Sequence, residues 1–204
     1  SLHSAVTSNV INMIEDRGDA FYIMDLIDVN ATVAQASNAT VGLDSSYAGV
    51  YYPWVKILDA TTNKPIFVPP SVVLPGVFAN NDKQAGPWFA PAGLNRGGLG
   101  QVIETKNKLS QSERDTLYAS RVNPIAQFPG VGIAVYGQKT LQVKASALDR
   151  INVRRLLIDL KVFVATASKS LVFDQNTAVT RNKFLNTVNP YLESVQQRQG
   201  LYSY

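Results

Sequence analysis

The first part of the chain alternates between helical and extended patterns of hydrophobic residues. Between Ser4 and Arg17 apolar residues recur at helical spacing, and Gly18 follows as a stop, which predicts a helix. Residues 20–28 are mostly apolar and predict a strand. Residues 30–46 are rich in Asn, Ala, Thr and Ser, a composition typical of a surface connection or a weak helix.

The middle of the chain predicts a β-hairpin followed by a long irregular segment. Two strand-like runs, residues 50–58 and 65–69, bracket a polar turn at 61–64. Prolines end the second run because they lack a backbone donor. Residues 71–100 are rich in Gly, Pro and Asn, so we expect a loop there. A loop of that length inside a compact domain usually has a function.

Three short elements are predicted after this loop. A Ser-x-x-Glu capping box at residues 110–113 predicts a helix that continues to about Arg121 and ends at the Asn-Pro pair of residues 123–124. Runs at 131–136 and 139–143 then predict two strands, separated by Gly137 and Gln138.

Two long helices are predicted for the last quarter of the chain, at residues 149–168 and 176–199. The first has a wide apolar face and a narrow apolar stripe on its opposite flank. The wide face contains Val153, Leu156, Leu157, Leu160, Phe163 and Val164, and the narrow stripe contains Ile151, Ile158 and Val162. This helix is therefore either sandwiched in the core or in contact with another molecule. Pro190 either kinks the last helix or starts a new one.

Composition places the chain among ordinary folded domains and shows where its charge lies. The 204 residues are 46% hydrophobic and 17% charged, which suits a single domain over residues 1–204. Residues 1–138 carry a net charge of −2, whereas residues 139–183 hold 9 Lys and Arg against 3 Asp, a net +6. This concentration fits either a solvated helix face or a surface that docks on an acidic partner. Nucleic-acid motifs are absent, so no direct nucleic-acid contact is expected.

The residues that carry most enzyme chemistry are missing or misplaced. The chain has no Cys and a single His, which disfavours thiolate catalysis, His-based triads and clustered metal ligands. Residues 132–140 nearly match a phosphate-binding loop, but Gln138 separates the Gly from the Lys that must follow it directly. Asp25 and Asp28 point to opposite faces of a strand and make a poor carboxylate pair. We expect no enzyme activity, no cofactor and no metal.

The ends of the chain and its hydropathy set two further expectations. No segment has the roughly 18 to 20 uncharged apolar residues that a membrane helix needs, so no membrane insertion is expected. The chain starts without Met, and its last residues, Leu201, Tyr202, Ser203 and Tyr204, read as the start of a strand. We interpret it as a core fragment that lacks flanking arms and any outer domains.

Several short strings, taken in order along residues 45–176, resemble one family, the contractile tail sheath proteins of myophages and related injection machines. The strings are Ser46-Tyr47-Ala48, Tyr51-Tyr52-Pro53-Trp54, Val68-Pro69-Pro70-Ser71, Pro75-Gly76-Val77, Gly86-Pro87-Trp88-Phe89-Ala90-Pro91-Ala92-Gly93, Asn123-Pro124-Ile125, Tyr136-Gly137-Gln138-Lys139-Thr140, Asp149-Arg150-Ile151-Asn152-Val153-Arg154-Arg155-Leu156 and Phe173-Asp174-Gln175-Asn176. A giant phage of the phiKZ kind fits as a source.

The resemblance implies an α+β fold, a small mixed β-sheet flanked by helices, as the tube-proximal core domain of a sheath subunit. It implies a structural protein of the virion tail, assembled in the host cytoplasm, that polymerises helically around the tail tube. The polymer would then contract to drive the tube through the host envelope. The implied partners are other copies of the chain, the tail tube protein, and baseplate and tail terminator proteins. Residues 201–204 would add a strand to a neighbouring subunit's sheet.

The basic region gives a hypothesis about contacts with the tube or with other subunits. The candidate contact residues are Arg150, Arg154, Arg155, Lys161 and Lys169. In the alternative, Arg154 or Arg155 is structural and pairs with Asp159 or Asp174. Two other functions stay open: another virion or baseplate structural protein, and a soluble nucleotide-binding enzyme domain built on the Gly-rich segments.

Overall fold

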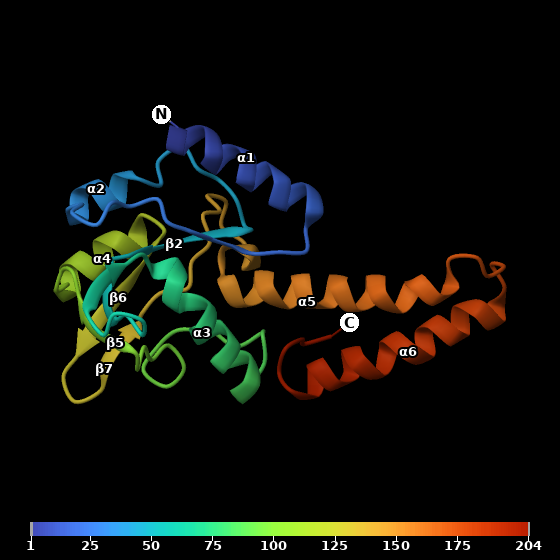
Figure 1. Cartoon of the computed structure of the whole chain (residues 1–204). Coiled ribbons are helices and arrows are strands. Elements are labelled where there is room, and N and C mark those ends of the chain that lie inside the picture. Colours follow the sequence, from blue (N-terminus) through green and yellow to red (C-terminus); the bar gives the residue numbers. More distant parts are fainter. Residues whose placement is uncertain (1, 204) are drawn as a thin grey trace.

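A mixed four-stranded sheet forms the centre of the molecule, and a helical hairpin projects from it (Figure 1). The computed structural model describes residues 2–203, with side chains described from residue 5 onward. The elements in chain order are α1 (Leu2–Arg17), β1 (Tyr22–Met24), α2 (Val33–Asn38), β2 (Ala48–Tyr52), β3 (Val55–Leu58), β4 (Pro65–Val68), α3 (Pro70–Gln84), β5 (Val102–Thr105), α4 (Gln111–Ala119), β6 (Val122–Phe128), β7 (Gly132–Val135), η1 (Ala147–Asp149), α5 (Ile151–Ser168), η2 (Lys169–Leu171) and α6 (Ala178–Gln197).

The central sheet has the strand order β1-β2-β6-β7 and is covered on both faces. Strands β1, β2 and β6 are parallel, and β7 returns antiparallel to β6. Every residue of β2 is buried, as expected for a strand with packed layers on both sides. Because successive side chains point to opposite faces, Val50 and Tyr52 lie in one core and Tyr51 lies in the other.

Different helices close the two cores. The first core contains residues of α1, α2 and α4 against the sheet: Ile11, Met24, Ile27, Ala31, Ala36, Ala48, Val50, Tyr52, Leu117, Val122 and Leu141. The second contains residues of α3 and the start of α5: Tyr51, Val55, Val73, Leu74, Val77, Phe78, Leu99, Ile125, Ile133, Val135 and Ile151. A separate antiparallel sheet, β4-β3-β5, contributes Val55 to this second core.

The predicted α+β class, a small mixed sheet flanked by helices, is confirmed. The predicted helices at 4–17, 110–121, 149–168 and 176–199 correspond to α1, α4, α5 and α6. The capping box of α4 is formed, with both Ser110 and Glu113 bonding to the other's backbone amide. Helix α6 continues through Pro190 without a second start. None of the described helices is long and apolar enough to cross a membrane.

The loop predicted at residues 71–100 is wrong in its first half, because residues 70–84 form α3. Pro70 suits the first helical turn, where no partner exists for its missing N–H. Val73, Leu74, Val77 and Phe78 are buried at helical spacing against the second core. Burial of this stripe outweighs the poor helix propensity of the prolines, Gly and Asn residues between them.

Three strand predictions also need correction. The single run predicted at 50–58 is two strands, β2 and β3, which belong to different sheets on either side of Pro53. Strand β6 was not predicted, because Pro124 in its middle resembles a break. Residues 139–143 form no strand. The amide of Leu141 donates to the Ala48 carbonyl at 3.0 Å, and Lys139 makes only an isolated bridge to Arg150.

A clasp around Trp88 joins the hairpin to the body. The Trp88 indole N–H donates to the Arg198 carbonyl at 3.0 Å, and the Arg198 guanidinium lies 4.8 Å from the indole ring centre. The same guanidinium donates to the Ala85 carbonyl, while Asn152 donates to the Trp88 carbonyl. Gly200 lies so close that an added Cβ would come within 3.0 Å of the indole. The 85–93 loop thus holds both helices of the hairpin at their base.

We predict that Trp88→Phe lowers the free energy of unfolding by about 1–3 kcal/mol, because a partly buried hydrogen bond is lost and a gap remains. Urea denaturation measures this change. The matched aromatic control is Phe173→Leu, since Phe173 is fully exposed, and it should change stability by less than about 0.5 kcal/mol. Equal effects of the two substitutions would contradict the clasp.

Candidate functional site: a basic helical hairpin

Helices α5 and α6 pack antiparallel and extend away from the sheets (Figure 1). Their contact is fixed by stacked rings of Phe163 and Tyr191, with centres 3.9 Å apart, and by a hydrogen bond from the Tyr191 hydroxyl to Asp159 Oδ2 at 2.5 Å. The base is closed by a small cluster around Trp88, Leu156 and Val195. The hairpin is therefore anchored at one end and exposed at the other.

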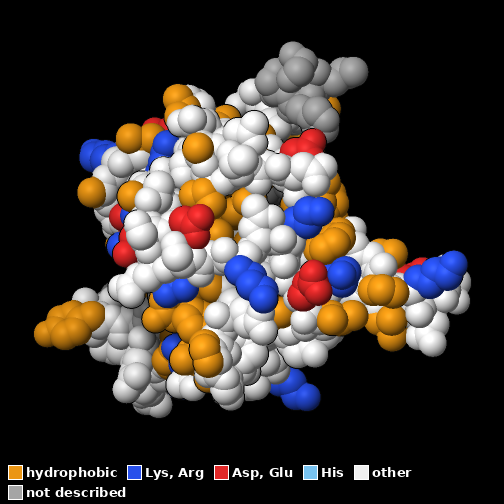
Figure 2. All heavy atoms as spheres, turned by 90° about the vertical axis from the view of Figure 1, so that its left-hand side faces the viewer, with side chains coloured by type: hydrophobic (Ala, Val, Ile, Leu, Met, Phe, Trp, Pro, Cys, Tyr) orange, Lys and Arg blue, Asp and Glu red, His pale blue; other side chains and the backbone are white. Residues whose placement is uncertain are grey.

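The positive charge predicted for residues 139–183 lies largely on this hairpin, and Lys139, Lys144 and Arg150 precede it. Residues 1–150 carry 12 Lys and Arg and 12 Asp and Glu, so the body is formally neutral. Residues 151–204 carry 7 Lys and Arg against 3 acidic residues, which equals the whole net charge of +4. Figure 2 shows that blue and red side chains are interspersed on one face of the molecule, as expected for a neutral body.

Arg154 is buried inside the molecule. Only 8% of this residue is exposed, its guanidinium donates to Ser46 Oγ at 2.5 Å, and it lies 4.0 Å from the centre of the Tyr47 ring. Burial lowers the pKa of Arg154, because the charged form is less well solvated there. Its Nε has no hydrogen-bond partner among the described atoms.

Arg155 forms a bidentate ion pair that ties α5 to α3. Its two terminal nitrogens donate to the Asp82 carboxylate at 2.9 and 2.5 Å, and its guanidinium lies 4.6 Å from the centre of the Phe78 ring. The predicted pairing of Arg154 or Arg155 with Asp159 or Asp174 is therefore wrong. Arg154 binds Ser46 instead, and Arg155 binds Asp82.

Arg150 and Lys161 also have partners within the chain. Arg150 pairs with Asp149 at 3.1 Å and donates to the Tyr118 hydroxyl. Lys161 donates to the Arg17 carbonyl at 3.1 Å, at the end of α1, where a cation offsets the helix dipole.

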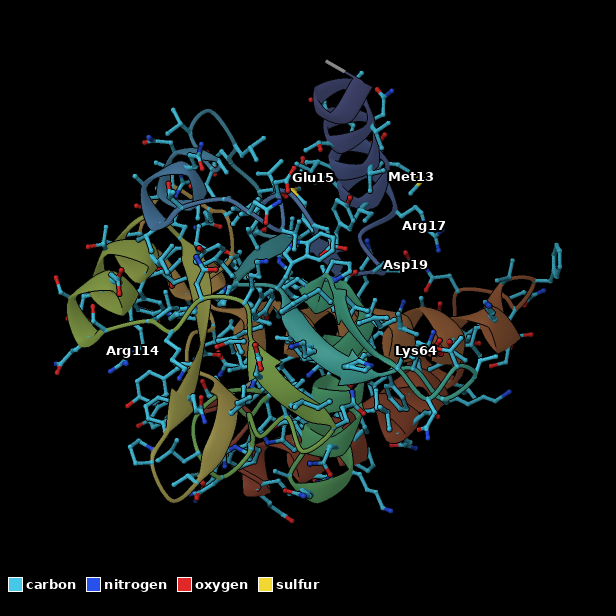
Figure 3. All side chains as sticks on the ribbon, turned by 60° about the vertical axis from the view of Figure 1, so that its left-hand side comes forward. Met13, Glu15, Arg17, Asp19, Lys64 and Arg114 are labelled. Carbon is cyan, nitrogen blue, oxygen red and sulfur yellow. The ribbon has the colours of Figure 1, made fainter. Side chains whose placement is uncertain are left out.

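The residues around the C-terminal end of α1 surround the contact between Lys161 and the Arg17 carbonyl. Figure 3 shows Met13 and Arg17 pointing outward from α1. Glu15 lies on the side toward the body, where it accepts a hydrogen bond from Ser45 at 2.6 Å. Arg17 pairs with Asp19 just beyond the helix, at 3.0 Å. The basic residues at the root of the hairpin are thus part of a network that fixes α1 and α5.

The outer half of the hairpin carries exposed cations without a carboxylate partner among the described residues. Lys169 is exposed, and its ammonium has no ion pair or hydrogen bond within the described residues. Lys183 is likewise exposed, and Arg181 only bonds to Asn176 on the adjoining turn at 2.8 Å. The charge count along the sequence indicated the basic region at residues 139–183, but Arg181 and Lys183 were not among the candidate contact residues.

The tip of the hairpin is apolar as well as basic. Phe173 is 100% exposed, and Val172 and Val179 beside it are also exposed. A groove of about 410 Å³ near the tip is lined by Ser168, Leu171, Thr180, Arg181, Phe184 and Leu185. Sequence reasoning missed this patch. Its signal was an apolar pair, Val172 and Phe173, in a turn between two predicted helices.

The second apolar stripe of α5 is buried at its start and exposed further along, and its contact with another molecule stays a prediction. Ile151 is fully buried in the second core, whereas Val162, further along the same stripe, is 46% exposed. The helix is therefore sandwiched at its start and open toward its end.

The chain end predicted to exchange strands forms no strand in the described residues. Leu201 packs on the Trp88 cluster, and Tyr202 is exposed, with its carbonyl accepting from Gln196 at 2.7 Å. Ser203 is exposed, and Tyr204 lies outside the described residues. Strand exchange at residues 201–204 stays a prediction.

The described residues contain no group of three or more His, Cys, Asp or Glu side chains that could hold a metal ion. The near match to a phosphate loop is a packing contact, because an added Cβ at Gly137 would lie 2.9 Å from Asn123 Oδ1. No helix follows it directly. The described geometry is instead a two-sheet body from which a helical hairpin with an exposed tip projects.

Comparison with known proteins identifies the family. The sequence profile of the phage tail sheath protein central domain matches residues 1–141. The tail sheath protein of Vibrio phage KVP40 is 34% identical over 176 residues, which are 86% of this chain and 26% of that protein. The tail sheath protein of enterobacteria phage T4 is 32% identical over 184 residues, 88% of this chain and 27% of that protein. The chain therefore belongs to the phage tail sheath protein family, and it spans about a quarter of the length of these relatives.

Solved structures show the same fold. The sheath complex of the extracellular contractile injection system PVC, in its contracted state, matches with a TM-score of 0.77 and 28% identity, over 89% of this chain and 49% of that one. The contracted helical sheath of the anti-feeding prophage matches with a TM-score of 0.68 and 27% identity, over 87% of this chain and 46% of that one. Both matches extend beyond the profile and into the hairpin.

We predict that removal of the Arg155 charge destabilises the fold, whereas removal of the Lys169 charge does not. Arg155→Met keeps the aliphatic stem but leaves Asp82 without its partner, and should cost about 1.5–3 kcal/mol. Lys169→Met should change stability by less than about 0.5 kcal/mol. Urea denaturation of both variants tests this difference. An equal response would mean that the Arg155 pair is dispensable.

We also predict a pH effect from the Tyr191–Asp159 contact. Burial, followed by the hydrogen bond to Asp159, raises the pKa of Tyr191 from 10.0 to about 12. The folded state thus keeps this proton to higher pH than the unfolded state. Its contribution to stability is complete below pH 10 and is lost as the pH rises through about 12. The free energies of unfolding of wild type and Tyr191→Phe should therefore converge between pH 10 and about 12. A difference in the free energy of unfolding that does not change with pH would contradict the assignment.

Proposed function

We propose that this chain is the tube-proximal core of a contractile tail sheath subunit. In this proposal the subunits polymerise helically around a tail tube, and the polymer contracts to drive the tube through the host envelope. The observation that carries the proposal is the similarity to the PVC sheath in its contracted state, at 28% identity and a TM-score of 0.77. The relatives from phages KVP40 and T4 are likewise tail sheath proteins.

The mechanism we infer is mechanical rather than chemical. Energy is stored in the contacts of an extended helical polymer and is released when rigid subunits repack, without nucleotide hydrolysis by this chain. The covered sheet and the clasped hairpin support this inference, since they let the domain move as one body. We accordingly propose a structural role with no enzymatic activity, a place in the virion tail, and assembly in the host cytoplasm.

We propose four kinds of partner. Other copies of the subunit form the polymer, the tail tube protein lies inside it, and baseplate and terminator proteins close its two ends. Residues 201–204 would add a strand to the sheet of a neighbouring subunit. Support comes from the position of Leu201, which packs on the Trp88 cluster at the base of the hairpin, and from the exposure of Tyr202 and Ser203 after it.

The hairpin is our candidate for the surface that faces an acidic tube or subunit. Of the five residues proposed from the sequence, Arg150, Arg154, Arg155 and Lys161 have partners within the chain, so in this proposal they set the position of the hairpin. Lys169 supplies a free charge, together with Arg181 and Lys183. Exposed ion pairs each contribute about 0–1 kcal/mol, so several of them can hold the extended state and still separate on contraction.

We predict that the double charge reversal Lys169→Glu and Lys183→Glu weakens attachment of the full-length sheath protein to purified tail tube several-fold at low salt, and that added salt narrows the difference from wild type. Co-sedimentation quantifies attachment, and negative-stain electron microscopy shows whether sheathed tubes form.

The matched control reverses two exposed cations of the body, Lys64→Glu and Lys108→Glu, and should attach like wild type. Normal attachment of the hairpin variant would overturn the charged-tip assignment. Failure of the wild-type protein to form any tubular polymer would overturn the sheath proposal itself.

A further inference from the structure

A small pocket at the foot of α5 collects positive charge that the chain does not neutralise. It has a volume of about 240 Å³ and lies between the end of α4 and the segment that leads into α5. Its lining residues are Ala119, Arg121, Lys139, Thr140, Gln142, Val143, Ala145 and Asp149. This pocket is separate from the hairpin tip and plays no part in the function proposed above.

Arg121 contributes a positive charge whose hydrogen bonds go to neutral groups. Its guanidinium donates to the carbonyls of Leu43, Leu141 and Thr40, at 2.8, 2.5 and 3.3 Å. Its backbone has a φ of 63°, in the left-handed region that residues other than Gly rarely adopt. These three bonds hold Arg121 in place, but none of them supplies a negative charge.

Lys139 brings a second cation into the same pocket. Its ammonium donates to the Tyr118 carbonyl at 3.0 Å and lies 4.4 Å from the centre of the Tyr118 ring. Burial, together with the nearby Arg150, lowers the pKa of Lys139. The partners of this ammonium are therefore also neutral, and its charged form is at a disadvantage in the free protein.

Asp149 is the one carboxylate among the lining residues, and it already forms an ion pair with Arg150. Its side chain pairs with Arg150 Nε at 3.1 Å. Among the lining residues, Arg121 and Lys139 thus share a single carboxylate, which leaves a formal excess of one positive charge. Asp44, which does not line the pocket, accepts a hydrogen bond from the Val143 amide at 2.9 Å. Arg121 and Lys139 are half-buried, and positive charges held close together and partly removed from water are costly unless an anion joins them.

We propose that this pocket binds one small oxyanion group, a phosphate or a carboxylate, between Lys139 and Arg121. Lys139 supplies a charge-assisted hydrogen bond, which is stronger than its present bond to a carbonyl, and Arg121 adds electrostatic attraction. A carboxylate ligand corresponds to an Asp or Glu side chain from a neighbouring chain, and a phosphate ligand corresponds to a free or nucleotide-borne group.

The test compares inorganic phosphate and acetate with chloride at matched ionic strength. Two readouts are followed in the 204-residue chain: the melting temperature, and the amide chemical shifts of Thr140, Gln142 and Asp149. We expect phosphate or acetate to raise the melting temperature saturably and to shift these amides together. Saturation by acetate alone assigns a carboxylate, and saturation by phosphate assigns a phosphate group.

Charge-matched variants separate the pocket from general salt effects. Lys139→Gln should abolish the saturable response, whereas Lys144→Gln, which removes an exposed charge outside the pocket, should keep it. Lys139→Arg provides a folded variant with the charge retained if Lys139→Gln does not fold, and it should still respond. A response that is absent in wild type, or equal in wild type and Lys139→Gln, would overturn the proposal.

Discussion

The anchoring of two adjacent arginines at the root of α5 is the constraint on which the arrangement of the hairpin depends. Arg154 is buried, and only 13% of the Arg155 side chain is exposed. A guanidinium removed from water is costly unless polar groups bind it, so Arg154 and Arg155 require Ser46 and Asp82 in fixed positions. These partners belong to the segment before β2 and to α3, and α5 is thereby tied to both. The direction of the hairpin follows from these bonds and from the Trp88 clasp at its base.

This anchoring divides the basic residues into two groups with different tasks. Near the root, Arg150, Arg154, Arg155 and Lys161 bind groups of the body and contribute to its rigidity. Toward the tip, positive charge and apolar side chains such as Phe173 stay exposed. A stiff body with an exposed contact element suits a subunit of a helical polymer, in which movement between subunits must be transmitted rather than absorbed. Membership of the tail sheath family agrees with this division.

Much of the fold was predictable from local patterns, and the errors have physical causes. Hydrophobic spacing and capping residues located α1, α4, α5 and α6. Helix α3 was missed because Pro75 and its neighbours have poor helix propensity, which burial in the second core overrides. The basic region was predictable by counting Lys and Arg against Asp and Glu along the sequence. Which of its cations have partners within the chain was not predictable, because the partners of Arg155 and Arg154 lie 73 and 108 residues away in the sequence.

Hydrogen–deuterium exchange on the full-length protein, free and assembled on tail tubes, tests the central claim most directly. The account predicts that assembly slows exchange over residues 169–185, at the exposed end of the hairpin, while the already buried strand β2 changes little. Unchanged exchange over residues 169–185, with new protection confined to other faces of the body, would contradict the assignment of the hairpin as the contact element.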